Sequence, residues 1–181
     1  MTDPAKLLHA LAFAAERHRD QRRKGSTKSP YINHPIAVAE VLAGAGKVTD
    51  EALLLAAVLH DTVEDTETSF EELEELFGPD VTGLVREVTD DKKLPKAVRK
   101  QLQIEHADGT SQRGKMLKIA DKTCNLRDIG STPPPDWSHE RKAEYVEWSD
   151  AVMSGLRGVN AGLERAYDEA AARARASLVP R

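Results

Sequence analysis

The sequence predicts an all-α fold: a single compact bundle of about eight to ten helices with little or no sheet. Apolar residues recur at three- and four-residue spacing along most of the chain, and no segment shows convincing alternation of apolar and polar residues. Aromatic residues make up only 4% of the 181 residues. The core must therefore consist of Leu, Val, Ile and Ala, which favours helices over a β-sandwich. No internal repeat or interdomain linker is visible, so we expect residues 1–177 to form one domain.

Residue types that start and stop helices divide the first half of the chain into segments. The dipeptide Asp3-Pro4 is a typical helix start, and the pair at 49–50 (TD) is placed to cap a later helix. Ser69 with Glu72 matches a capping box. We therefore expect helices over about residues 4–24, 35–44, 50–61 and 70–77.

The second half is divided in the same way. Gly78-Pro79 ends one helix and opens the next, and Pro95 begins another. The prolines of residues 131–135 (STPPP) form a stiff turn in which no helix can continue. Further helices are expected over about residues 79–88, from 95 onward, and over 115–127, 138–157 and 159–176. Residues 178–181 (LVPR) read like the remnant of a thrombin-cleavable tag and are left out of the fold prediction.

Composition and charge exclude several classes of protein. No stretch reaches the ~18 consecutive apolar residues of a membrane span, and the N-terminus does not read as a secretory signal. The single cysteine, Cys124, cannot form an internal disulfide, so we expect a reducing, cytoplasmic setting. A net charge of −4 argues against a nucleic-acid partner. Basic clusters at 17–28 and 92–100 instead favour a small anionic ligand.

An imidazole and three carboxylates gather at the polar end of an apolar segment. Residues four apart share a helix face, which places His60 above Glu64 and Asp61 above Asp65. Burying so many ionisable groups is costly unless a cation or strong hydrogen bonds compensate. A divalent metal would supply that compensation. The alternative is an exposed acidic helix end, and for a His-Asp dipeptide alone that interpretation would be preferred.

Two distant residues favour the metal. His34 directly precedes an expected helix start, and Asp121 lies in an otherwise apolar helical stretch, where a charge is rarely buried without a partner. Two imidazoles and two carboxylates make a mixed nitrogen and oxygen ligand set. Such a set suits Mn²⁺, Fe²⁺, Co²⁺, Ni²⁺ or Zn²⁺ better than Ca²⁺.

The order His, His-Asp, Asp resembles the signature of the HD-domain phosphohydrolase superfamily. The surrounding motifs resemble its RelA/SpoT-homologue hydrolase branch, and most closely the stand-alone small alarmone hydrolases of the metazoan type. These motifs, which span about residues 5–165, are RRK at 22–24, PYINHP at 30–35, LHDTVEDT at 59–66, EVTDDK at 87–92 and KIADK at 118–122. The resemblance implies an HD-domain helical fold and a (p)ppGpp 3′-pyrophosphohydrolase with one Mn²⁺ per chain, which yields GDP or GTP and pyrophosphate.

The resemblance also implies a role for individual residues. His34, His60, Asp61 and Asp121 match the metal ligands, and other first-row metals stay open. Glu64 and Asp65 match the acidic pair that stands beside the attacking water. The positions that match or resemble contacts to the guanine nucleotide are Arg23, Lys24, Asn125, Lys96, Arg141 and Tyr145.

Several alternatives remain open at this point. Arg23 and Lys24 could instead complement a helix C-terminus, and Lys96 could belong to a solvated basic face. The aromatic residues Trp137, Tyr145 and Trp148 could stack on a base or fill the core. The substrate could be another phosphorylated nucleotide such as NADPH, and a catalytically silent nucleotide sensor is the alternative from another functional class. The oligomeric state is open, with a homodimer as one option.

Overall fold

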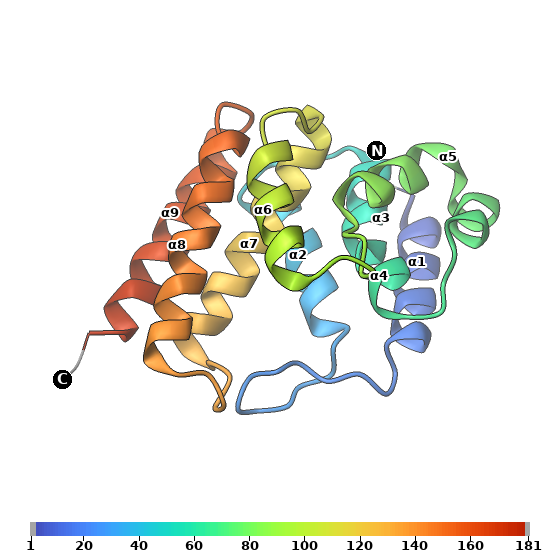
Figure 1. Ribbon diagram of the computed structural model, residues 1–181. Coiled ribbons are helices and arrows are strands. Elements are labelled where there is room, and N and C mark those ends of the chain that lie inside the picture. Colours follow the sequence, from blue (N-terminus) through green and yellow to red (C-terminus); the bar gives the residue numbers. More distant parts are fainter. Residues whose placement is uncertain (1–2, 180–181) are drawn as a thin grey trace.

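The computed structural model describes residues 3–179, and all regular elements in this part of the chain are helices, as predicted (Figure 1). An isolated bridge between Arg22 and Pro30 is the one β-type pairing within residues 3–179. The helices within these residues number nine, inside the expected range. They are α1 (Pro4–Arg17), α2 (Asn33–Gly44), α3 (Glu51–Leu59), α4 (Thr62–Asp65), α5 (Phe70–Val88), α6 (Lys96–His106), α7 (Gln112–Ser131), α8 (His139–Leu156) and α9 (Ala161–Ser177).

The predicted caps are present. The side chain of Asp3 accepts a hydrogen bond from the backbone N–H of Ala5, and that of Asp50 accepts one from Leu53. Ser69 caps α5 in the same way. The break expected at Gly78-Pro79 is a kink inside α5, where Gly78 adopts φ 84°, a conformation that glycine tolerates best.

One boundary expectation was wrong. α1 ends at Arg17 rather than near residue 24, because the chain turns back on itself over residues 18–31. Backbone N–H groups of Arg23 and Tyr31 donate to the carbonyls of Ser29 and Gln21, at 2.9 and 3.1 Å. This returning segment, here called the 18–31 segment, carries the basic cluster away from α1 and toward α7.

Two helices form the centre of the molecule. α3 is apolar on all sides, and its residues from Leu53 to Leu59 are all buried against α1, α2 and α5. α7 packs against α2, α8 and α9 and also contacts α3 (Figure 1). Polar groups that these two helices carry into the interior are therefore held by rigid surroundings. None of the helices described is long and apolar enough to cross a membrane.

A close approach between α9 and the end of α2 depends on Gly162. A Cβ at this position would overlap the carbonyl oxygen of Ala45. We expect Gly162→Ala to lower the free energy of unfolding by about 1–3 kcal/mol, measured by urea denaturation. The matched control is Gly83→Ala, since a Cβ there meets nothing within 4 Å inside α5. It should raise stability by up to about 1 kcal/mol through helix propensity. Equal effects of both substitutions would contradict this account.

Candidate active site

Three of the four predicted metal residues meet where α2, α3 and α7 converge. His34 comes from the first turn of α2, His60 directly follows α3, and Asp121 lies in the middle of α7. One ligand atom from each lies within 4.8 Å of the others. His34 Nε2 is 3.0 Å from Asp121 Oδ1. These residues could hold a divalent metal ion.

Asp61, the fourth predicted ligand, borders the same cluster. Its Oδ2 lies 3.2 Å from His60 Nε2 and 3.8 Å from His34 Nε2. The hydroxyl of Tyr31 donates to that oxygen at 2.7 Å. The carboxylate is thereby held toward both imidazoles.

The cluster fits a cation on its own geometry. His60 Nδ1 donates to the carbonyl of Ala57 at 2.8 Å, which leaves Nε2 as the free ring nitrogen. That Nε2 is buried and has no hydrogen-bond partner among the residues described. Burial opposes a charge on His60, yet the carboxylates of Asp61 and Asp121 outweigh it and raise its pKa to about 9. A positive charge is therefore favoured at this point.

The acidic pair lies on the short helix α4, beside the cluster. Burial raises the pKa of Glu64 to about 7. The backbone N–H of Asp90 donates to Glu64 Oε2 at 3.1 Å, and this hydrogen bond acts in the opposite direction by lowering the pKa. Asp65 accepts a 2.9 Å hydrogen bond from Gln21 Nε2 and pairs with Lys92. The single helix expected through His60 and Glu64 is interrupted, since Asp61 lies between α3 and α4 as the N-cap of α4. Both carboxylates nevertheless lie within a turn of the metal residues.

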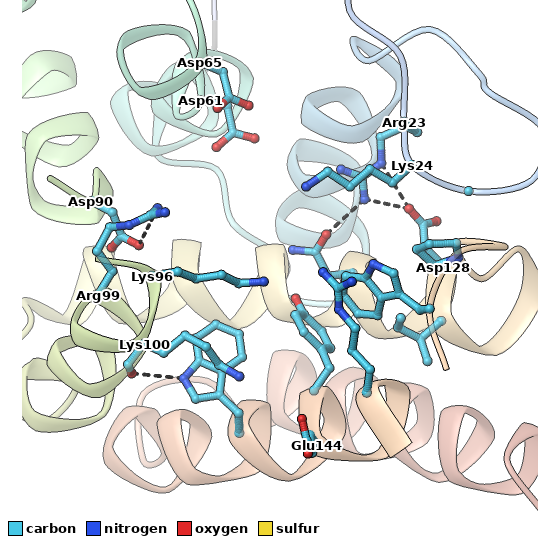
Figure 2. A pocket seen from close by; sticks show the side chains of 18 of the residues that line it. Arg23, Lys24, Asp61, Asp65, Asp90, Lys96, Arg99, Lys100, Asp128 and Glu144 are labelled. Carbon is cyan, nitrogen blue, oxygen red and sulfur yellow. Dashed lines mark hydrogen bonds and ion pairs between the residues drawn. The ribbon is translucent and has the colours of Figure 1, made fainter. Parts of the chain in front are cut away.

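Glu64 and Asp65 are among the residues that line a cavity of about 860 Å³, which Figure 2 shows from close by. A narrower cavity of about 160 Å³ contains the metal residues, and Asp61 and Glu64 line both cavities. All six residues expected to contact a nucleotide line the larger one: Arg23, Lys24, Lys96, Asn125, Arg141 and Tyr145.

Cations from two parts of the chain face each other across this cavity, which carboxylates also line. Burial lowers the pKa of Lys96, and the neighbouring cations Arg141 and Lys24 lower it further. Figure 2 shows Arg23 and Lys24 on one side of the cavity and Lys96, Arg99 and Lys100 of α6 on the other. Cations that destabilise one another in this way favour a bound anion.

Arg23 links the cavity to the metal cluster. Its Nη2 donates to Asn125 Oδ1 at 2.9 Å, and Asn125 Nδ2 donates to Asp121 Oδ1 at 2.7 Å. Its Nε also donates to Asp128 Oδ2 at 3.1 Å (Figure 2). The alternative in which Arg23 complements the C-terminus of the first helix is wrong, because α1 ends six residues earlier at Arg17.

Sequence reasoning did not single out His18, which is buried beside the site. His18 is only 2% exposed, its ring lies 4.8 Å from that of Tyr31, and its Nδ1 is 2.6 Å from Gln21 Oε1. Gln21 and Tyr31 were not singled out either, although each hydrogen-bonds an acidic site residue. Their positions beside RRK and inside PYINHP were the available signal.

The aromatic residues are partly committed to packing. Trp148 Nε1 donates to the carbonyl of Lys100 at 3.0 Å, and Lys122 Nζ lies 3.9 Å from its ring centroid. The Arg141 guanidinium lies 4.4 Å from the Trp137 ring centroid at the cavity wall. Lys122 was also missed. It is 4% exposed, and burial lowers its pKa to about 8.

Comparison with known proteins gives consistent matches. A family model described as HD domain matches residues 10–147. The chain is 54% identical over 167 residues to a Xenopus tropicalis protein named guanosine-3′,5′-bis(diphosphate) 3′-pyrophosphohydrolase MESH1, covering 92% of this chain and 93% of that one. The Homo sapiens protein of the same name is 52% identical over 165 residues, covering 91% and 92%.

Solved structures agree. A structure described as a metazoan orthologue of SpoT that hydrolyses ppGpp superposes with a TM-score of 0.91 at 51% identity, over 94% of this chain and 96% of that chain. A protein of Listeria monocytogenes EGD-e superposes with a TM-score of 0.65 at 28% identity, over 83% and 99%.

Metal binding is directly testable by thermal unfolding. At a hundredfold excess over its dissociation constant, an ion that binds only the folded state adds about 2.7 kcal/mol. We expect Mn²⁺ to raise the melting temperature by about 5–10 °C and a chelator to reverse the shift. Asp121→Asn should lose most of the shift, whereas Asp108→Asn, at an exposed carboxylate, should keep it. An identical shift in both variants would place the ion elsewhere.

Proposed function

The chain belongs to the HD-domain family, within the branch of the MESH1 pyrophosphohydrolases, and on that premise we propose that it hydrolyses (p)ppGpp at the 3′-diphosphate. The products are GDP or GTP and pyrophosphate. One observation supports this most strongly: a buried cluster that favours a cation adjoins a larger cavity with cations on two sides, and Asp61 and Glu64 line both spaces. The enzyme is thus a metal-dependent phosphohydrolase of a guanine nucleotide.

His34, His60, Asp61 and Asp121 would hold the ion, for which we propose Mn²⁺ at one ion per chain. When bound, the ion would polarise the scissile phosphoryl group and lower the pKa of a water molecule near it. The Tyr31 hydroxyl holds Asp61, and the Asn125 amide holds Asp121. Both carboxylates are therefore fixed before an ion arrives.

In the reaction, a water oxygen attacks the phosphorus attached to the ribose 3′-oxygen, and the bond between that phosphorus and the 3′-oxygen breaks. The leaving 3′-oxygen takes a proton from a solvent water molecule and becomes the 3′-hydroxyl. Glu64 takes the proton of the attacking water, and the pKa of about 7 that results from its burial suits a base near neutral pH. Asp65, held by Gln21, orients the same water. The two carboxylates thus act as base and positioning partner.

The substrate's phosphates would lie among the cations of the larger cavity. Arg23 and Lys24 would contact one phosphate chain of the nucleotide, and Lys96 and Arg141 would contact its other phosphate chain. Asn125 and Tyr145 line the cavity between them. Every residue in this account belongs to one chain, so the reaction requires no second copy, and we leave a homodimer open.

We propose further that residues 1–177 act as one catalytic domain in the cytoplasm, where the lone thiol of Cys124 would stay reduced. Residues 178–181 remain proposed as a tag remnant. Of these, 180 and 181 lie outside the part of the chain that the structure describes.

The activity is tested by pyrophosphate release from ppGpp with added Mn²⁺. Glu64→Gln and Asp65→Asn should each lower kcat by at least about 100-fold while Mn²⁺ still binds stoichiometrically, because the ligands are untouched. Glu67→Gln, an exposed carboxylate two residues beyond the pair, is the matched control and should keep wild-type kcat.

Three results would contradict the proposal. Near-wild-type turnover by both variants with bound metal would remove the acidic pair from the mechanism. Phosphate release from NADPH without pyrophosphate release from ppGpp would favour the alternative substrate. Tight binding of either nucleotide without turnover would identify a silent sensor.

A further inference from the structure

Lys122 is a buried cation that the proposed reaction does not use. It lies on α7 directly after Asp121, and its residue is 4% exposed. Its Nζ donates to Gln103 Oε1 at 2.8 Å and lies over the ring of Trp148. A buried ammonium group is costly unless it is paired, so its contact with Gln103 requires an explanation.

The ammonium fixes the orientation of the Gln103 amide. An ammonium group can only donate hydrogen bonds, so Gln103 must present its oxygen to Lys122. The amide nitrogen is then directed to the other side, where Nε2 donates to Asp90 Oδ2 at 2.7 Å. A flipped amide would set two donors against each other at one end and two acceptors at the other.

Asp90 connects the oriented amide of Gln103 to Glu64. It lies just beyond α5, and its backbone N–H donates to Glu64 Oε2 at 3.1 Å. Arg99 Nη1 lies 3.9 Å from Asp90 Oδ2 and 3.7 Å from Glu64 Oε1 (Figure 2). Holding the Asp90 side chain therefore holds the backbone group that contacts the Glu64 carboxylate.

We propose that Gln103 and Asp90 are positioning residues, which with the buried ammonium of Lys122 form a directed hydrogen-bond relay that holds the Glu64 carboxylate for the attacking water. The relay rests on the proposed function, because it acts through the role given there to Glu64. It joins α7, α6 and the segment after α5 to α4. Asp90 and Gln103 also line the larger cavity, so the test must separate an effect on kcat from an effect on KM.

Reversing the polarity of the relay provides the test. The carboxylate of Gln103→Glu can still accept the hydrogen bond from Lys122. It also faces the carboxylate of Asp90, however, and like charges at hydrogen-bond distance repel. Adding Asp90→Asn restores a hydrogen bond, now donated by the new amide to the new carboxylate, and returns the net charge to that of the wild type. The backbone N–H at position 90 is present in every variant.

We expect Gln103→Glu to lower kcat about 10- to 100-fold with KM changed less than about threefold, and the double variant to recover most of that loss. Gln101→Glu is the matched control on α6, where the exposed Gln101 bonds Glu105 in the same way at 2.9 Å. It should keep wild-type kcat. If Gln103→Glu does not fold, Gln103→Met replaces it as a neutral variant that cannot bridge Lys122 and Asp90.

A second readout does not require turnover. Amide hydrogen exchange of residue 90, followed by NMR, reports the contact with Glu64. Exchange should accelerate about tenfold in Gln103→Glu, return in the double variant and stay unchanged in Gln101→Glu. Gln103→Met should accelerate it as well. If the wild type hydrolyses no ppGpp, the proposed function fails, and exchange alone then decides the relay.

Three results would overturn the relay. A raised KM with unchanged kcat in Gln103→Glu would show that Gln103 contacts the substrate instead. A kcat loss that the double variant does not recover would show that the two side chains do not act as a pair. Unchanged exchange at residue 90 in Gln103→Glu and Gln103→Met would separate Gln103 from the Glu64 contact.

Discussion

The structure depends on a cluster of buried imidazoles and carboxylates in its interior, which needs a compensating positive charge. Two buried imidazoles and the carboxylates of Asp61 and Asp121 lie so close together that a positive charge must be present among them. Without a metal, a proton on His60 meets this demand, and a divalent ion would meet it more fully. The hydrogen bonds from Tyr31 and Asn125 keep the acceptors in place in either case.

The fold assigns the two tasks of the site to different kinds of element. The residues proposed to hold the metal lie on or beside α2, α3 and α7, which pack against one another in the core and cannot move independently. The cations that face the cavity come from α6, α8 and the 18–31 segment, where long side chains can adapt to an anion. Rigid metal residues combined with adaptable cations suit a reaction in which water must be placed accurately while a large nucleotide enters and leaves.

Local sequence signals predicted most of the fold. The caps at Asp3, Asp50 and Ser69 and the break at Gly78 depend on neighbouring residues alone, and all four are where the sequence placed them. The end of α1 was mispredicted because it depends on contacts that residues 18–31 make with one another and with α7, which no helix signal encodes.

The site was predicted unevenly for a similar reason. Its metal and acidic residues lie in recognisable motifs, and the structure brings them together. Gln103 lies in no motif, and Lys122 lies inside KIADK but received no role, because an amide and an ammonium on helix surfaces are usually solvated. The packing of α6 against α8, and of α8 against α7, buries Lys122 and half-buries Gln103, and that arrangement is set by residues distant in the chain.

The returning 18–31 segment has a consequence for variation. Its base is closed by the bridge between Arg22 and Pro30 and by the backbone hydrogen bond from Arg23 to Ser29. Arg23 is also tied to α7 through Asn125 and Asp128. The tip, residues 26–28, lies beyond these ties, and lengthening a closed loop costs little free energy. Relatives of this chain can therefore differ in length and composition at the tip while the guanidinium beside the metal cluster keeps its place.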